Sequence, residues 1–340
     1  MKKFIFKTSP YQHQRESFDS SANRENFALL MDMGTGKTKV CLDTIGHNFE
    51  QGKIQLVIIV APKGVIANWV GEIKTHLPDR IEREIVLWKP NLTKTKRQEL
   101  KELYEKSGKL KFLLMNVEAY STKKGVDVAE FFVKKFKVFM AVDESTTIKN
   151  RQAKRTKAIC AVGRGAVMRR ILTGSPVTKS PMDLFSQMDF LSPEILGFKS
   201  YYAFQGRYAV VQRRTMGYHS FNHVVGFRRL DELTETLEAH SYRVRKEDCL
   251  DLPDKVYVKR EVELTKEQSD AYTQMKHLAL ARLESGELAT TQNVLTQIMR
   301  LQQICLGHLT DDDGEVHPIK SNRLNELLDI CDELQGKAII

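Results

Sequence analysis

Residues 29–38 read LLMDMGTGKT, an apolar run that leads directly into a Gly-Thr-Gly-Lys-Thr segment. A phosphate-binding loop needs free backbone N–H groups, a lysine for the β and γ phosphates and a hydroxyl group for Mg²⁺. The two glycines can supply the N–H groups, Lys37 the cation and Thr38 the hydroxyl. The strict pattern GxxxxGK[ST] is not met, because Met31 stands where its first glycine belongs. Taken alone, the stretch favours a nucleotide site over a tight turn and leaves both interpretations open.

Short apolar runs alternate with amphipathic segments from residue 54 to about residue 191. This alternation predicts an α/β fold with a parallel sheet and crossover helices. The expected strands are 55–61, 111–117, 138–142 and 169–174, and the expected helices include 65–77, 96–107 and 153–162.

The pattern changes after residue 191. Residues 209–227 form two β-type runs around a Met-Gly-Tyr turn, which predicts a β-hairpin within an insert at about 197–230. From residue 264 onward, apolar residues recur at helical spacing, so the C-terminal region is expected to be mainly helical.

Two adjacent acids end one of the expected strands, in KVFMAVDEST at 137–146. Such a pair usually marks only an exposed loop. Here it follows a candidate phosphate loop on a separate strand of the same α/β pattern. Asp143 could hold Mg²⁺ directly or through water, and Glu144 could orient and deprotonate the attacking water. Lys37, Asp143 and Glu144 are therefore the candidate catalytic residues, with Thr38 and Asp143 as metal ligands.

Charge is concentrated in one part of this 340-residue chain, whose formal net charge is +10. Residues 151–230 contain 14 lysines and arginines against 3 acidic residues, a balance of +11, so the remainder is close to neutral. This clustering favours a nucleic-acid partner over a merely solvated surface, and it points to Arg213 and Arg214 in the expected hairpin. The five scattered cysteines and the lack of a signal peptide or long apolar run predict a cytoplasmic protein with no membrane partner.

The order of these motifs resembles superfamily-two helicases, most closely the Swi/Snf-type DNA translocases. The resemblance covers nearly the whole chain. Its most specific element is an LTGSP segment followed by DLFSQMDFL. It rests on TSPYQHQ, MGTGKT, IIVAPKGVIANWVGEI, VDESTTIKN, ILTGSPVTKSPMDLFSQMDFL, QIMRLQQIC and the last 22 residues.

The resemblance implies roles for individual residues. Gln12 matches the glutamine that recognises adenine, so ATP with Mg²⁺ is the implied nucleotide. Lys63 falls in a segment that touches the nucleic-acid backbone in relatives, and Thr173 and Ser175 match the element that couples ATP state to the tracked strand. The phosphate loop is matched by Gly34, Thr35, Gly36, Lys37 and Thr38.

The same resemblance divides the chain into parts. It implies a RecA-like first lobe at 1–240, a linker strand and helical region at 241–318, and the start of a second RecA-like lobe at 319–340. The second lobe would supply arginines to the ATP cleft. The nearest matching string is Gln205-Gly206-Arg207, whose spacing is wrong. The isolated chain is therefore expected to have very low ATPase activity.

The implied function is an ATP-driven motor on duplex or branched DNA in replication, recombination or repair. The short region between the phosphate loop and the acidic box suggests a compact viral or bacterial type, expected as a monomer in a bacterium or a phage-infected cell. Thr146 stands where many relatives have histidine or aspartate, so coupling is expected to differ while the hydrolysis chemistry survives. An RNA helicase and a nucleic-acid-binding module without turnover remain alternatives. A small-molecule P-loop kinase would need neither the basic region nor the helical tail.

Overall fold

The computed structural model describes residues 4–90, 94–105, 107–216, 219–249, 256–284, 291–311, 313–334 and 336–339. The chain divides into two compact units, Met1–Leu252 and Pro253–Ile340. Each is described by itself. In the described residues, the helices are all too short or too polar to cross a membrane.

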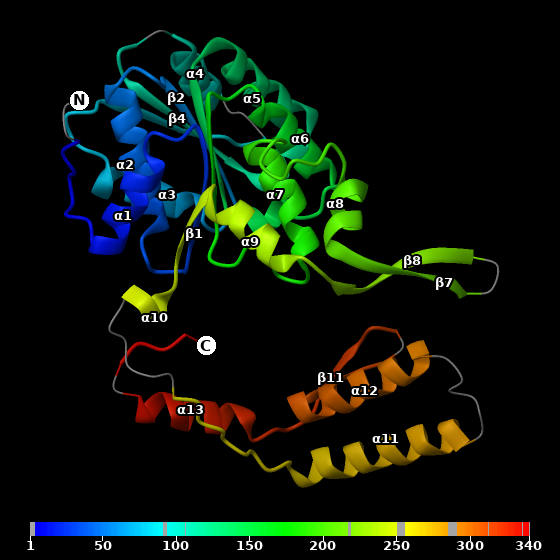
Figure 1. The fold of residues 1–340 in the computed structure, drawn as a ribbon. Coiled ribbons are helices and arrows are strands. Elements are labelled where there is room, and N and C mark those ends of the chain that lie inside the picture. The colour runs from blue at the N-terminus through cyan, green and yellow to red at the C-terminus, as the bar shows by residue number, and fades with distance from the viewer. Residues whose placement is uncertain are drawn as a thin grey trace. The chain divides into compact units, whose positions relative to one another are not determined.

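The first unit is built on a seven-stranded sheet of order β3-β4-β2-β5-β6-β1-β9, in which every described pairing is parallel (Figure 1). The predicted α/β class and parallel sheet are confirmed. The strands are β1 (Asn26–Met31), β2 (Leu56–Ala61), β3 (Arg83–Leu87), β4 (Leu110–Asn116), β5 (Val138–Asp143), β6 (Met168–Leu172) and β9 (Ser241–Val244).

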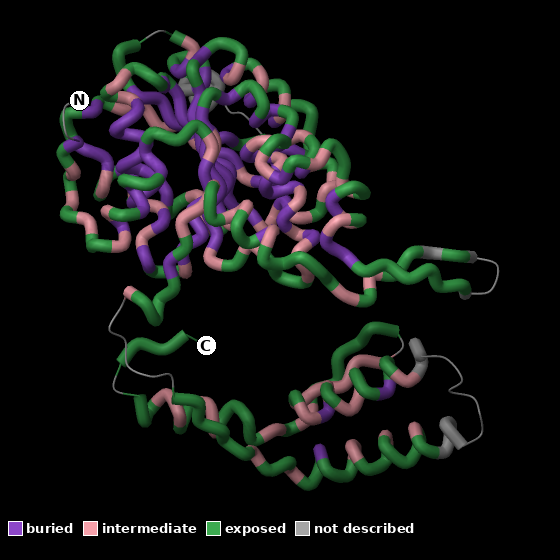
Figure 2. Tube along the Cα trace, viewed as in Figure 1, coloured by how far each residue is buried: buried purple, intermediate pink, exposed green. Residues whose placement is uncertain are grey.

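Helices cover both faces of this sheet. On β2, Leu56, Ile58 and Val60 pack into one core, while Val57 and Ile59 pack into the other. Strands buried on both faces explain the nearly continuous apolar runs in the sequence, and Figure 2 shows the sheet as the buried centre of the unit. The helices are α1 (Gln12–Ser21), α2 (Lys37–Glu50), α3 (Ile66–His76), α4 (Lys94–Tyr104), α5 (Lys123–Lys135), α6 (Lys154–Gly163), α7 (Leu184–Leu191), α8 (Tyr201–Tyr208), α9 (Leu230–Glu238) and α10 (Lys246–Cys249).

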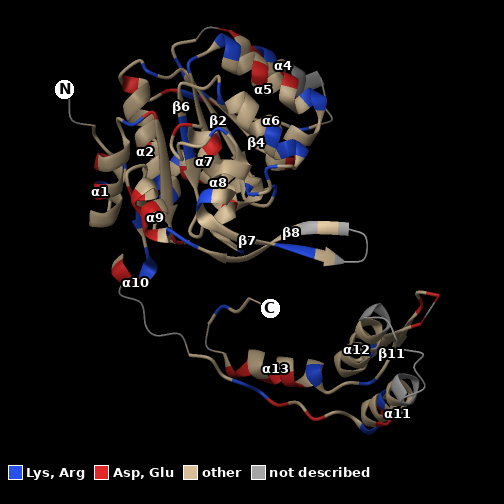
Figure 3. Cartoon of the chain, turned by 45° about the vertical axis from the view of Figure 1, so that its right-hand side comes forward, with Lys and Arg blue, Asp and Glu red and all other residues tan. Residues whose placement is uncertain are grey.

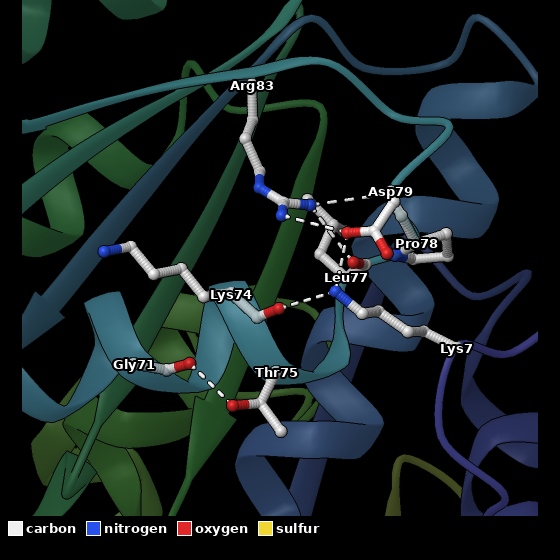
Figure 4. Close-up of polar contacts among 8 residues, drawn as sticks. All are labelled: Lys7, Gly71, Lys74, Thr75, Leu77, Pro78, Asp79 and Arg83. Carbon is white, nitrogen blue, oxygen red and sulfur yellow. Dashed lines mark hydrogen bonds and ion pairs between the residues drawn. The ribbon is translucent and has the colours of Figure 1, made fainter.

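The end of α3 is tied to the N-terminal segment by polar contacts (Figure 4). The Lys7 ammonium donates to the Lys74 carbonyl at 2.7 Å and to the Asp79 carboxylate at 2.6 Å. Arg83 donates to the Leu77 carbonyl at 3.1 Å. Cations are favourable at a helix C-terminus, where carbonyl groups lack partners. These contacts fix the segment that leads into α1.

An insert follows α7 and ends at β9. It contains α8, then the antiparallel hairpin of β7 (Ala209–Met216) and β8 (His219–Phe227), and then α9. The predicted hairpin is therefore present, and its Gly217-Tyr218 tip lies outside the described residues. The chain then returns to the sheet as β9, which pairs with β1. For this reason the first unit extends past residue 240, where the sequence had placed the end of the first lobe.

The second unit is mainly helical, as its periodicity indicated. It consists of α11 (Lys266–Glu284), α12 (Thr291–Leu306), a small hairpin of β10 (His308–Thr310) and β11 (Val316–Pro318), and α13 (Arg323–Glu333). The buried Gln268 amide links α11 to α12 by donating to the Ile304 carbonyl at 2.8 Å.

Candidate nucleotide site and nucleic-acid surface

The phosphate loop lies between β1 and α2 and has the backbone that bare N–H groups require. Gly34 has φ of 86° and Gly36 has φ of 90°, a left-handed conformation that glycine adopts without steric cost. At Gly36 a Cβ atom would also lie 2.2 Å from the Gln14 amide nitrogen. The N-terminus of α2, which begins at Lys37, adds a partial positive charge to the loop.

Helix α1 is fastened to this loop by Gln14, a buried residue that the sequence did not single out. Its carbonyl oxygen accepts from the Tyr11 backbone N–H at 3.1 Å, and its amide donates to the Thr35 carbonyl at 3.1 Å. The Thr35 hydroxyl donates to the Asp32 carbonyl at 2.8 Å. Thr35 therefore uses its side chain to shape the loop, and its role in binding the nucleotide stays a prediction.

One pocket brings together residues that the sequence had nominated on two separate strands. Gly34, Gly36, Lys37 and Thr38 come from the loop after β1, and Asp143 and Glu144 come from the end of β5. Lys37 Nζ lies 3.2 Å from Glu144 Oε1, so the two candidate groups form an ion pair. The remaining lining residues are Met33, Val65, Asn68, Trp69 and Glu72.

Trp69 is a site residue that sequence reasoning missed. This side chain of α3 is 1% exposed, and its indole N–H donates to Asp143 Oδ2 at 2.9 Å. The other carboxylate oxygen accepts from the Glu144 backbone N–H at 3.0 Å. Burial raises the pKa of Asp143, while the Trp69 hydrogen bond and the Lys37 charge act to lower it. A tryptophan on an amphipathic helix is ordinarily a core residue, so its pattern carried no signal of this contact.

Replacing Trp69 by phenylalanine tests this contact. We expect ATP hydrolysis to fall roughly 10–100-fold, the usual loss when a group that orients a metal ligand is removed. Without the indole donor the pKa of Asp143 rises further, so activity should also fail at a higher pH during acidification. The measurement is the pH profile of ATPase activity in a two-lobed form of the protein.

Trp88 offers a matched control. It is also buried, but its indole N–H has no hydrogen-bond partner in the described residues. Trp88→Phe should therefore lose packing without moving the pH profile. Equal profiles for Trp69→Phe and Trp88→Phe would remove Trp69 from the site.

A buried glutamine connects the acidic box with the Thr173–Ser175 segment. Gln187 on α7 accepts from the Ser145 hydroxyl at 2.6 Å and donates to the Pro176 carbonyl at 2.7 Å. The Thr173 hydroxyl accepts from the Ser175 backbone N–H at 3.3 Å. The two nominated coupling residues thus lie in a loop that one side chain ties to the residue after Glu144. Gln187 was missed because a polar residue on a helix usually faces solvent.

A second pocket, lined partly by Gln12, lies beside the phosphate loop. One wall is the start of α1, with Tyr11, Gln12, His13 and Glu16, and the other is α10, with Glu247, Asp248 and Cys249. Both walls are attached to the loop. His13 Nε2 lies 2.8 Å from the Thr35 carbonyl oxygen, and the Lys246 backbone N–H donates to Asp32 Oδ2 at 3.1 Å.

The nominated nucleic-acid residues are exposed and lie on two different elements. Lys63 is in the turn after β2, on the side of the sheet where the C-terminal ends of the parallel strands lie. Arg213 and Arg214 lie on β7 of the hairpin, where Figure 3 shows a basic stretch.

The base of the hairpin is held by Glu232 of α9. This carboxylate pairs with Arg207, whose Nε donates to it at 3.0 Å, and it accepts from the Tyr208 hydroxyl at 3.0 Å. Arg228 donates to the Gly206 carbonyl at 2.6 Å. Arg207, the arginine of the Gln205-Gly206-Arg207 string, therefore anchors the hairpin.

Comparisons with known proteins agree with this architecture. The sequence profile of a family described as SNF2-related domain matches residues 11–308. An uncharacterized ATP-dependent helicase of Mycoplasma genitalium is 25% identical over 307 residues, covering 90% of this chain and 27% of the relative. The mouse helicase-like transcription factor is 25% identical, covering 81% and 27%. The chain spans about a quarter of the length of these two relatives.

A solved structure also has a similar fold. The Sulfolobus solfataricus SWI2/SNF2 ATPase core in complex with dsDNA matches with a TM-score of 0.55 and 20% sequence identity. The match covers 98% of this chain and 66% of that chain. It supports the RecA-like architecture expected from the sequence.

Proposed function

The chain belongs to the SNF2-related domain family, and from that premise we propose that it forms the first lobe and helical region of an ATP-driven DNA translocase. The observation that carries this proposal is the pocket in which Lys37 and Thr38 meet Asp143 and Glu144. These are the four groups that γ-phosphate hydrolysis needs from a first lobe. ATP-dependent helicases among the relatives support ATP as the nucleotide.

The oxygen donors in the pocket suit Mg²⁺. The Thr38 hydroxyl and the Asp143 carboxylate are hard ligands of the kind that this ion prefers. Both Asp143 oxygens already accept hydrogen bonds, which favours contact through water. Bound there, Mg²⁺ would neutralise charge on the phosphates.

Lys37 and Glu144 are proposed to separate when ATP binds. Their 3.2 Å ion pair holds the lysine on the carboxylate. A triphosphate on the loop offers Lys37 more negative charge than Glu144 does. When the Lys37 side chain moves to the phosphates, Glu144 becomes free to accept a proton from the attacking water. Lys37 is the single cation among the described residues that line this pocket. We therefore expect arginines from a second RecA-like lobe to complete it.

Nucleotide binding and DNA-stimulated turnover test the proposed function separately. ATP affinity is measured on this chain, and ATPase activity on a two-lobed form with duplex DNA, a forked junction, single-stranded DNA or RNA. Stimulation by duplex or forked DNA is the expected result. Stimulation by RNA alone would favour an RNA helicase, and nucleic-acid binding without turnover would favour a binding module.

Charge reversal on the hairpin tests its contact with DNA. Arg213→Glu combined with Arg214→Glu should weaken duplex binding and make it less salt-dependent, because fewer phosphate contacts release fewer counterions. ATP affinity should not change. The measurement is duplex affinity at several salt concentrations.

The control reverses Lys53 and Lys137, two exposed lysines just before β2 and β5. Because the strands are parallel, Lys53 and Lys137 lie at the N-terminal ends of the strands, whereas Lys63 lies at the C-terminal ends. If both double variants lost the same affinity, net charge would explain the effect and the hairpin assignment would be wrong.

A further inference from the structure

The start of α1 carries a hydrogen-bonded series of three side chains beside the second pocket, which Gln12 partly lines. Gln12 Nε2 donates to Glu16 Oε1 at 2.9 Å. The other Glu16 oxygen accepts from the Tyr242 hydroxyl at 2.7 Å. Tyr242 lies on β9, so the series connects the α1 wall to the sheet strand that leads into the α10 wall.

The ionised state of Glu16 determines the direction of these hydrogen bonds. Hydrogen bonds from Tyr242 and Gln12 hold the pKa of Glu16 below its ordinary value, so Glu16 is ionised at neutral pH. An ionised carboxylate only accepts hydrogen bonds. Gln12 must therefore turn its amide nitrogen toward Glu16, because the reverse orientation would place the amide oxygen against a negative charge.

This orientation determines what Gln12 can offer a ligand. Its carbonyl oxygen remains an acceptor, and its amide nitrogen retains one N–H after donating to Glu16. On its N7 side, adenine presents an amino donor beside a ring-nitrogen acceptor and matches that pair. Guanine and hypoxanthine present two acceptors there and would need both N–H groups of the Gln12 amide, one of which is donated to Glu16.

We infer that Glu16, anchored by Tyr242, is a positioning residue that locks the Gln12 amide and thereby makes the pocket select adenine over 6-oxopurines. This inference rests on the proposed function, because it assumes that a nucleotide places its base in this pocket. The attachments of both walls to the phosphate loop support that placement. Glu247 and Asp248 add further acceptors for an amino group.

The test compares dissociation constants for ATP and inosine triphosphate in the wild-type chain, in Glu16→Gln and in Tyr242→Phe. Glutamine at position 16 can donate or accept, so the Gln12 amide can turn its oxygen toward position 16 and present both of its N–H groups to the base. We expect the preference for ATP to fall about tenfold in Glu16→Gln, the value of one hydrogen bond that is lost or mismatched. Tyr242→Phe should lower it in the same direction by a smaller factor.

Asp19→Asn is the matched control. It removes the same charge from the same helix, where Asp19 pairs with Arg15 at 3.0 Å. Its ATP-to-inosine-triphosphate ratio should equal that of the wild type, and thermal unfolding shows whether each variant is folded.

The outcomes distinguish the inference from the proposal beneath it. A wild-type chain with no affinity for ATP would refute the proposed function. A wild type that binds both nucleotides equally, or a folded Glu16→Gln and Tyr242→Phe that keep the full preference for ATP, would overturn the inference alone.

Discussion

Replacing Glu144 by glutamine should abolish most ATP hydrolysis while leaving ATP bound. Loss of a general base costs about 10²–10⁴-fold in turnover. Asp143 keeps its Trp69 and backbone hydrogen bonds in this variant, so the metal ligand stays in place. Glutamine cannot hold Lys37 by charge, so ATP affinity should be equal to that of the wild type or slightly higher. The measurements are single-turnover hydrolysis in a two-lobed form and ATP affinity.

Glu130→Gln is the control for this variant. Glu130 lies on α5 and pairs with Lys134 at 3.3 Å, in a contact between two exposed side chains. Hydrolysis by Glu130→Gln should match the wild type. If Glu144→Gln lost ATP binding together with hydrolysis, the division of roles between Asp143 and Glu144 would be incorrect.

Lys37→Ala should differ from Glu144→Gln in its ATP affinity. It removes the cation that lines the phosphate pocket, so both ATP affinity and turnover should fall, the latter by about 10²–10³-fold. The Glu144 carboxylate, left without its partner, would also repel the phosphates. Competition against a fluorescent ATP analogue measures the affinity of this chain directly.

Lys53→Ala serves as the control for Lys37→Ala, because Lys53 is an exposed lysine in the turn before β2. It should bind ATP as the wild type does. Wild-type affinity in Lys37→Ala would mean that the loop does not hold the phosphates.

Much of the fold could be predicted because burial on both faces leaves a strong pattern. Strands such as Leu56–Ala61 are apolar at every position and cannot be mistaken for surface. Strand β3 was not predicted, since Arg83–Leu87 lies at the sheet edge, is mostly half-buried and mixes charged with apolar residues. Strand β9 was placed in a linker, because its pairing with β1 joins residues that are remote in sequence.

The candidate site likewise contains residues that local sequence motifs predict and residues that only packing places there. The glycines, Lys37, Asp143 and Glu144 are nominated by local motifs, and the parallel sheet then brings the ends of β1 and β5 to one edge. Trp69 and Gln187 depend on which way a helix presents its side chains to loops from other strands. That orientation follows from packing and register, which a single sequence does not reveal.

The pairing of β9 with β1 affects how the protein is made. Strand β1 ends at Met31 and pairs with β6 on one side, yet β9, its neighbour on the other side, is complete only at Val244, after the hairpin insert has been translated. At ~5–20 residues per second, ribosomal synthesis of the intervening segment takes roughly 10–40 s. During that interval β1 presents unpaired backbone groups to its surroundings, a condition that promotes association between nascent chains. For the same reason, a recombinant lobe cut at residue 240 would keep that edge open permanently, whereas one extending to residue 252 would close it.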